Sequence, residues 1–292
     1  LLQGGVLAGG PTTCEQARAH MRQSWRIVAF AVVIALLVMA LAPYIWIVLT
    51  SFKTRIDALA DVPIWLFSPT LDHYPKVFID KGYLPLVWNS AIVASSTTVL
   101  SLAAGAPAAY VFARHRFAGK EDLFFFFLTT RMAPPISIVV PLFLLFTDIG
   151  ITDKLIAVII AHTSFNLSLV VWMMRGFFAD IPQEVDEAAQ MDGLSRAGTF
   201  LKVLVPMAAP GLAASAILCF ILSWNEFLYA FILVAFEGRT LTVGIPGLIT
   251  PHGTLWGQVA AVAVVATLPI IAFTILVQRH LVRGLTFGAV KG

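Results

Sequence analysis

Apolar residues in this chain gather in long runs, separated by short segments that hold most of the charges. A helix needs about 20 apolar residues, at about 1.5 Å each, to cross the hydrocarbon core of a bilayer. Six runs satisfy that length and predict six transmembrane helices: Ile27–Leu49, a segment within Leu84–Ala113, Leu123–Thr147, Leu155–Met174, a run from near Val203 to Glu226, and about Val259–Val277.

Two of these runs contain features that interrupt a regular helix. Arg131 lies inside the third run and is followed by Pro134 and Pro135, which remove backbone donors and predict a break. The segment Phe227–Phe236 is too short for a seventh crossing. We interpret it as a tilted continuation of the fifth helix or as a re-entrant turn.

The composition supports a membrane protein. Hydrophobic residues make up 59% of the 292 residues, charged residues only 12%, and the mean hydropathy is +0.88. A soluble domain is about half apolar and about a quarter charged. We therefore predict an all-α integral membrane protein. Its two cysteines have no metal-binding spacing, so we expect no metal site.

The basic residues predict an orientation, because cytoplasmic loops collect Lys and Arg. Twelve basic residues lie on the side that holds both termini and six on the other, with Arg131 inside a span. Both termini are therefore predicted to be cytoplasmic. The same loops account for the pI of about 9.0, so we expect no nucleic-acid partner.

The loop between the fourth and fifth runs carries an acidic, small-residue segment, EVDEAAQMDG at positions 184–193. We predict a short helix with Asp180 as its N-cap and Gly193 at its end, followed by a second helix capped by Ser195. The acids suit the positive end of the helix dipole. A helix with small residues on one face can enter a groove of another protein. An ordinary interfacial helix with a solvated acidic face is the alternative.

This loop also resembles a known signature. Glu187-Ala188-Ala189, three residues, Gly193, nine residues and Val203-Leu204-Val205-Pro206 are similar to the EAA pattern of bacterial ABC importer permeases, with Val203 and Val205 replacing Ile and Leu. Further stretches resemble the carbohydrate-uptake branch, in particular its maltose-permease-like second subunit: SFKT at 51–54, NS at 89–90, ARHRFAGK at 113–120, SWNEF at 223–227 and QRHLVRGLTFGAVKG at 278–292.

The resemblance implies a type I ABC importer transmembrane domain whose EAA helix couples to a cytoplasmic ATPase. Its implied coupling residues are Asp186, Glu187, Ala188, Ala189, Asp192 and Gly193. It further implies a cytoplasmic segment 1–26, a permease domain 27–292 with a core at about 84–279, and a cytoplasmic tail 280–292 in a bacterial inner membrane. In the maltose system the corresponding tail inserts between the ATPase subunits.

The expected partners follow from the same resemblance. They are a second, related permease subunit, an ATPase dimer that binds ATP and Mg²⁺, an extracytoplasmic solute-binding protein, and the lipid bilayer. The chain has no G-x-x-x-x-G-K-[ST] motif, so we expect it to bind no nucleotide or other cofactor and to have no catalytic residues. The loop 236–258 is expected to reach into the binding protein.

Polar residues within the apolar runs are candidates for contact with a cargo, because a charge in the membrane usually has a function. A sugar or polyol needs hydroxyl partners and an aromatic face. The candidates are Arg131, His162, Asn166, Trp224, Asn225 and Glu226. Structural alternatives remain: an Arg131–Glu226 ion pair, interhelical hydrogen bonds from His162 and Asn166, and interfacial anchoring by Trp224.

Two other classes of protein fit less well. A secondary transporter needs acids near the midplane and internal repeats, and Glu226 is the only candidate acid. A membrane-embedded enzyme lacks its usual motifs here. The cargo itself stays open between a neutral disaccharide, a polyol and a phosphorylated compound such as a glycerol phosphate.

Overall fold

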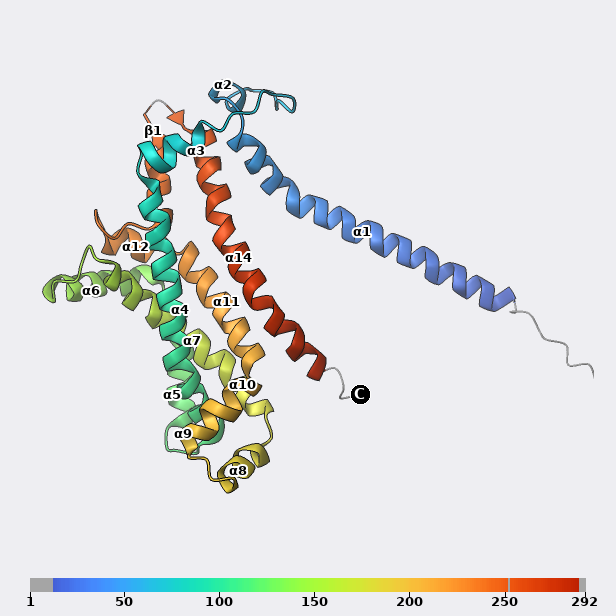
Figure 1. Ribbon diagram of the computed structural model, residues 1–292, viewed down its shortest axis with the longest axis vertical. Helices are drawn as coiled ribbons and strands as arrows, with labels where there is room; N and C mark the ends of the chain where they lie inside the picture. Colours follow the sequence, from blue (N-terminus) through green and yellow to red (C-terminus); the bar gives the residue numbers. More distant parts are fainter. Residues whose placement is uncertain (1–12, 252, 289–292) are drawn as a thin grey trace, which may run out of the picture.

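The computed structural model describes residues 13–251 and 253–288, with side chains from residue 25 to residue 277 apart from residue 252, and is almost entirely helical (Figure 1). A short hairpin pairs Ile249 with Thr254. The elements are α1 (Thr13–Ser51), α2 (Arg55–Ala58), α3 (His73–Pro75) with a π-helical turn Lys76–Asp80, α4 (Tyr83–Arg114), α5 (Lys120–Thr129), α6 (Pro135–Asp148), α7 (Leu155–Asp180), α8 (Gln183–Met191), α9 (Arg196–Thr199) with a π-helical turn Phe200–Leu204, α10 (Val205–Met207), α11 (Ala209–Asn225), α12 (Leu228–Leu233), α13 (Leu241–Gly244) with a 3₁₀ turn Ile245–Leu248, β1 (Ile249–Thr250), β2 (Gly253–Thr254) and α14 (Trp256–Gly288).

The centre of the fold is the packing of α4 against α7, with α11 and α14 beside them (Figure 1). Small residues allow the backbones to approach. At Gly105 an added Cβ would lie 2.7 Å from Val170 Cγ1, and at Gly211 it would lie 2.4 Å from the ring of Phe177. Small side chains at such positions are typical of membrane helix interfaces, where close van der Waals packing replaces the hydrophobic effect.

All six predicted runs fall on helices, and two of the runs are divided between shorter helices. Among the described residues, four helices are long and apolar enough to cross a membrane, namely α1, α4, α7 and α14. The pair formed by residues 196–207 and α11 is bent by 77° and makes a fifth crossing if it is counted as one broken span. The predicted third span is divided into α5 and α6, and the break falls at Thr130–Pro134, as the prolines predicted. This arrangement is consistent with the six predicted crossings.

Helix α1 diverges from the bundle and contacts α14 near the C-terminal end of α1 (Figure 1). Residues 25–43 of this helix are all exposed in this chain; Phe30, for example, is 67% exposed. After α1 the chain turns back at Lys53, whose side chain is only 1% exposed. Its ammonium group lies 3.9 Å from the centre of the Trp46 ring, a cation–π contact.

The end of α4 farthest from α8 holds the segment that precedes β1. Tyr83 Oη donates to the Gly244 carbonyl (2.6 Å), and the Asn89 amide donates to the Arg239 carbonyl (2.9 Å). Ser90 Oγ accepts from the Leu241 N–H at 2.8 Å. These bonds fix the loop between α12 and α13 against α4.

A second loop contact centres on Asp153, in the turn between α6 and α7. Its backbone is left-handed (φ 61°), and its Oδ1 accepts from the N–H groups of Ala235 (2.9 Å), Phe236 (2.8 Å) and Glu237 (3.2 Å). These hydrogen bonds, with that of Phe236 strongest, lower the pKa of the Asp153 carboxyl below its ordinary value.

Two local predictions need correction or refinement. Asp180 does not cap the acidic helix, because α7 continues through it and α8 begins after Pro182. The segment Phe227–Phe236 does not continue the fifth span directly. Glu226 is extended (ψ 135°), and the short helix α12 begins only at Leu228.

Candidate functional site

Helix α8 projects from one end of the bundle between α7 and α9 (Figure 1). Glu184 and Asp186 lie in its first turn, where carboxylates stabilise the helix dipole. Gly193 ends it in a left-handed conformation (φ +89°). The Leu194 N–H bonds to the Ala189 carbonyl (3.1 Å) and the Gly193 N–H to the Gln190 carbonyl (3.0 Å), which is the Schellman arrangement. The prediction that Gly193 ends this helix is thus confirmed.

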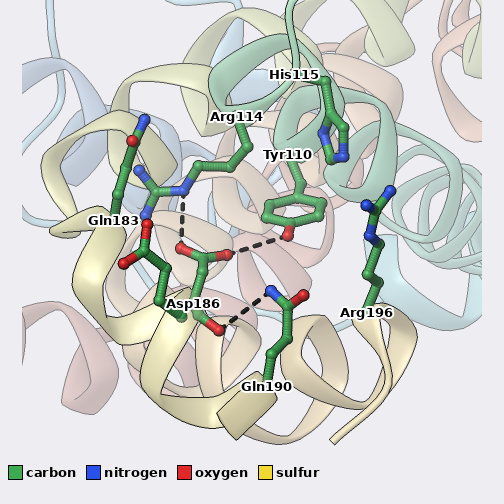
Figure 2. A pocket seen from close by; sticks show the side chains of 8 residues that line it. Tyr110, Arg114, His115, Gln183, Asp186, Gln190 and Arg196 are labelled. Atoms are coloured by element: carbon green, nitrogen blue, oxygen red, sulfur yellow. Dashed lines mark hydrogen bonds and ion pairs between the residues drawn. The ribbon is translucent and has the colours of Figure 1, made fainter.

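The inward face of α8 is held by one carboxylate. Asp186 Oδ2 lies 3.0 Å from Arg114 Nε, and its Oδ1 accepts from Tyr110 Oη at 3.0 Å (Figure 2). The Asp186 and Arg114 side chains are 11% and 8% exposed. The Arg114 guanidinium also donates to the Ile181 carbonyl at 2.7 Å. Arg114, at the end of α4, therefore binds both the link between α7 and α8, at Ile181, and the first turn of α8, at Asp186.

Aromatic rings pack around this contact. Tyr110 lies against Phe178 of α7 (5.9 Å between ring centres) and Phe200 of the turn after α9 (5.2 Å). Both apolar rings belong to the segments that flank α8 in the chain. We call Tyr110, Arg114 and Asp186 the α8 anchor, because together they join α4 to α8.

The other predicted coupling residues divide between two faces. Ala189 is buried against the bundle, whereas Glu187, Ala188, Asp192 and Gly193 are exposed. Beside the α8 anchor lies a recess of about 190 Å³, lined in part by His115, Glu187, Gln190 and Arg196 (Figure 2). Its walls present both positive and negative side chains.

Sequence reasoning placed Asp186 among residues that meet another protein and did not identify Arg114 or Tyr110 as its partners. The structure turns Asp186 inward, away from the exposed face of Glu187. One signal was available: Arg114 ends the second span on the same predicted side as the acidic loop. Nothing in the sequence alone states which of three nearby acids it would select.

A second polar cluster lies at the break between α11 and α12. His162 of α7 is fully buried, with Nδ1 at 2.7 Å from Ser223 Oγ and Nε2 at 3.1 Å from Glu226 Oε2. Glu226 also accepts the N–H groups of Tyr229 (2.9 Å) and Ala230 (3.2 Å). It therefore satisfies donors in the first turn of α12, which a helix start leaves without intrahelical partners.

The Arg131–Glu226 ion pair, the structural alternative to a cargo-binding role, is absent among the described residues, where Glu226 pairs with His162 instead. Arg131 and Glu226 nevertheless line one cavity of about 460 Å³, between the α5–α6 break, α7 and the α11–α12 break. Its wall combines the rings of Phe165 and Tyr229 with the hydroxyl of Ser164. We call it the central cavity. Aromatic faces beside charged and hydroxyl groups can bind a polyhydroxy compound.

The remaining pathway candidates lie elsewhere. Trp224 is 3% exposed, stacks on Phe220 and donates from Nε1 to the Ala266 carbonyl of α14 at 3.1 Å. Asn225 is exposed and donates to the Ile221 carbonyl at 2.9 Å. Asn166 is fully buried, and neither of its side-chain polar atoms has a hydrogen-bond partner among the described residues. The structure therefore brings together Arg131, His162 and Glu226, but not the other three.

Comparison with known proteins shows what the chain resembles. Residues 83–287 match the model of a family described as "Binding-protein-dependent transport system inner membrane component". The trehalose transport system permease protein SugB of Mycobacterium tuberculosis is 38% identical over 256 residues, which cover 87% of this chain and 93% of that protein. The trehalose/maltose transport system permease protein MalG of Thermococcus litoralis is 33% identical over 271 residues, covering 91% and 97%.

Solved structures agree with this similarity. A chain from the crystal structure of a bacterial ABC transporter involved in the import of the acidic polysaccharide alginate superposes with a TM-score of 0.73 at 25% identity, covering 88% of this chain and 96% of that one. A chain of the MetNI methionine ABC transporter gives a TM-score of 0.56 at 19% identity, covering 69% and 95%, and supports the fold.

Proposed function

The chain belongs to the family of binding-protein-dependent transport system inner membrane components, and we propose that it forms half of the translocation pathway of an importer driven by a separate ATPase. It is an integral membrane permease subunit of a sugar ABC importer and carries out no catalysis itself. The finer parts of the proposal concern its coupling helix, its cargo and its partners.

Coupling is assigned to α8. The observation that carries this assignment is the exposed surface of Glu187 and Ala188 on a helix that Asp186 joins to α4. A cleft on a cytoplasmic ATPase subunit receives this surface, and Glu187 pairs with a basic residue there. When ATP and Mg²⁺ close the ATPase dimer, the motion of α8 passes through the α8 anchor to α4. The spans then alternate between inward-open and outward-open states.

The cargo is a sugar or a related polyol, and the central cavity is its place of passage in this subunit. The names of the relatives support the class of cargo, and the wall of the cavity supports the chemistry. A second permease subunit completes the pathway, and a solute-binding protein delivers the cargo at the end opposite α8. This places both termini and α8 in the cytoplasm of a bacterial cell. The tail Gly284–Gly292 is assigned to the ATPase interface. Its residues 289–292 lie outside the described residues, and none of its side chains is described.

The test is reconstitution. Affinity purification of this chain is expected to recover an ATPase subunit and a second permease subunit, and proteoliposomes are expected to take up sugar only with ATP and the binding protein. Failure to recover an ATPase, or uptake driven by an ion gradient alone, would overturn the proposal.

The coupling helix has its own test. We expect Glu187→Lys to leave the membrane complex assembled but to abolish stimulation of ATP hydrolysis by the loaded binding protein, because a cation replaces the carboxylate at the exposed surface. Asp122→Lys is the matched control, with the same charge change on an exposed residue at the start of α5. Normal stimulation in Glu187→Lys would exclude a coupling role for this side chain.

A further inference from the structure

A basic recess lies at the end of the bundle opposite α8, where α2, the α3 segment and the start of α14 meet (Figure 1). Its volume is about 200 Å³, and its polar lining includes Arg55, His73, Lys76 and Gln258, with Trp256 beside them. No acidic side chain lines it among the described residues. The proposed transport function assigns no role to Arg55, His73 or Lys76, whereas Trp256 and Gln258 end the loop that is expected to meet the binding protein.

Two of the residues that line this recess each have a buried acceptor atom without a partner among the described residues. His73 is 9% exposed, and its Nε2 lies 2.7 Å from the Lys53 carbonyl, so Nε2 carries the proton that this bond needs. In neutral imidazole the other nitrogen, Nδ1, is then an acceptor. His73 Nδ1 and Gln258 Oε1 are both buried without a hydrogen-bond partner among the described residues. Unpaired buried polar atoms are destabilising, so this pair favours a ligand that carries hydroxyl donors.

The ring of His73 cannot turn away to find another partner. It packs on the backbone of Gly257, where an added Cβ would lie 2.2 Å from its Nε2. The position of the His73 ring is therefore fixed by the start of α14.

The cations of the recess favour an anionic group. Arg55 has no carboxylate within 4.0 Å among the described residues. The carboxylate of Asp57, on the same short helix, instead bonds to Thr54 Oγ1 at 2.7 Å. Lys76 forms an ion pair with Asp72 at 3.6 Å, and this pair is weak because its side chains are 55% and 69% exposed. A guanidinium beside an ammonium group is suited to the oxygens of a phosphate.

The surroundings of the recess indicate a membrane surface. The apolar stretch of α1 ends at Ser51, and that of α14 begins at Trp256, so the recess lies at the ends of two membrane spans. Apolar side chains are exposed on α2 and on the segment that follows it: Ile56 is 83% exposed, Leu66 94% and Trp65 66%. Exposed Trp and aliphatic residues with basic neighbours are typical of the boundary between lipid and water.

We propose that the basic recess binds the headgroup of an anionic phospholipid with a glycerol phosphate head, of which phosphatidylglycerol is the simplest. Arg55 and Lys76 contact the phosphate, and the terminal glycerol hydroxyls donate to His73 Nδ1 and Gln258 Oε1. The acyl chains lie along the exposed apolar residues next to α2. A bound lipid would thus link the α1–α2 connection to α14.

The test measures lipid retention by native mass spectrometry of the intact complex, purified in detergent, stripped of lipid and exposed to defined lipids. Phosphatidylglycerol is expected to bind about tenfold more tightly than phosphatidylethanolamine. Arg55→Gln is expected to weaken its binding by about tenfold, since a hydrogen-bonded charge pair is lost. Lys81→Gln, an exposed lysine outside the recess, is the matched control and should bind normally.

A second variant separates the two halves of the headgroup. Gln258→Leu should weaken phosphatidylglycerol but leave phosphatidic acid unchanged, because phosphatidic acid has no glycerol hydroxyls to donate. Equal retention of phosphatidylglycerol by the parent chain, Arg55→Gln and Gln258→Leu would overturn the proposal. If soluble glycerol phosphate or inorganic phosphate displaced the lipid at equal concentration, the site would belong to a soluble anion instead. Arg55→Lys, which keeps the charge, distinguishes lost binding from misfolding.

Discussion

Replacing Asp186 by alanine removes the centre of the α8 anchor. The change deletes the ion pair with Arg114 and the hydrogen bond from Tyr110, both at 3.0 Å, and leaves the guanidinium with only the Ile181 carbonyl among these contacts. Exposed ion pairs contribute about 0–1 kcal/mol, but this pair is about nine-tenths buried. Removing one partner of a buried pair costs about 3–5 kcal/mol. Because solvent lies close to the loop, we take the lower end, about 3 kcal/mol.

That free energy changes the balance between anchored and released α8 by roughly 100-fold, since 1.4 kcal/mol is a factor of ten. Backbone amides of α8 should then exchange hydrogen with solvent up to roughly 100-fold faster, while those in the middle of α7 remain unchanged. In reconstituted complexes we expect ATP hydrolysis to continue but less cargo to be moved per ATP, because α8 moves without carrying α4 with it.

The control for this prediction is a double-mutant cycle. Arg114→Ala, Asp186→Ala and the double variant should give a coupling free energy above about 1 kcal/mol, because neighbours in one network are not additive. The reasoning is wrong if Asp186→Ala leaves both the amide hydrogen exchange rates of α8 and the amount of cargo moved per ATP at the values of the parent chain. Asp186→Asn, which retains an oxygen for Tyr110, should have a smaller effect.

Three further changes have expected outcomes. Gly193→Ala should cost about 1 kcal/mol, because its φ of +89° disfavours any side chain, and should speed amide exchange at the end of α8 by about fivefold; an unchanged rate would exclude strain there. The lowered pKa of Asp153 means that its bonds stabilise the fold above its ordinary value near pH 4 and are lost as pH falls through the lower folded value. Melting temperature should therefore drop on the acid side of pH 4 in the parent chain and less in Asp153→Asn, and equal acid profiles would contradict this. Arg131→Ala should reduce cargo uptake with normal assembly, since Arg131 lines the central cavity and has no ion-pair partner among the described residues; loss of folded protein instead would assign it a structural role.

Much of the fold follows from local sequence, because long apolar runs and helix ends depend on neighbouring residues. The uncharged run of α4 and the end of α8 at Gly193 are of this kind, as is the cap at Ser195, whose Oγ accepts the Gly198 N–H at 3.1 Å. The break between α5 and α6 also follows from its two prolines.

The partners of polar side chains did not follow from the sequence. Glu226 selects His162 over Arg131 because the α11–α12 break turns its carboxylate toward α7 and the backbone of α12. Trp224 reads as an interfacial or cargo-binding residue but packs against α14. Such choices depend on the relative rotation of helices far apart in the chain, which a one-dimensional pattern does not contain.

The continuity of α4 gives it the character of a lever. Its 32 residues form a helix about 48 Å long. At one end Arg114 pairs with Asp186, and near the other end Asn89 and Ser90 form hydrogen bonds to Arg239 and Leu241. A tilt of roughly 5° about its midpoint displaces each tip by roughly 2 Å, in opposite directions. A small displacement of α8 is therefore transmitted by α4 to the opposite membrane surface, beside the loop assigned to the delivery of cargo. This coupling does not need to pass through the central cavity.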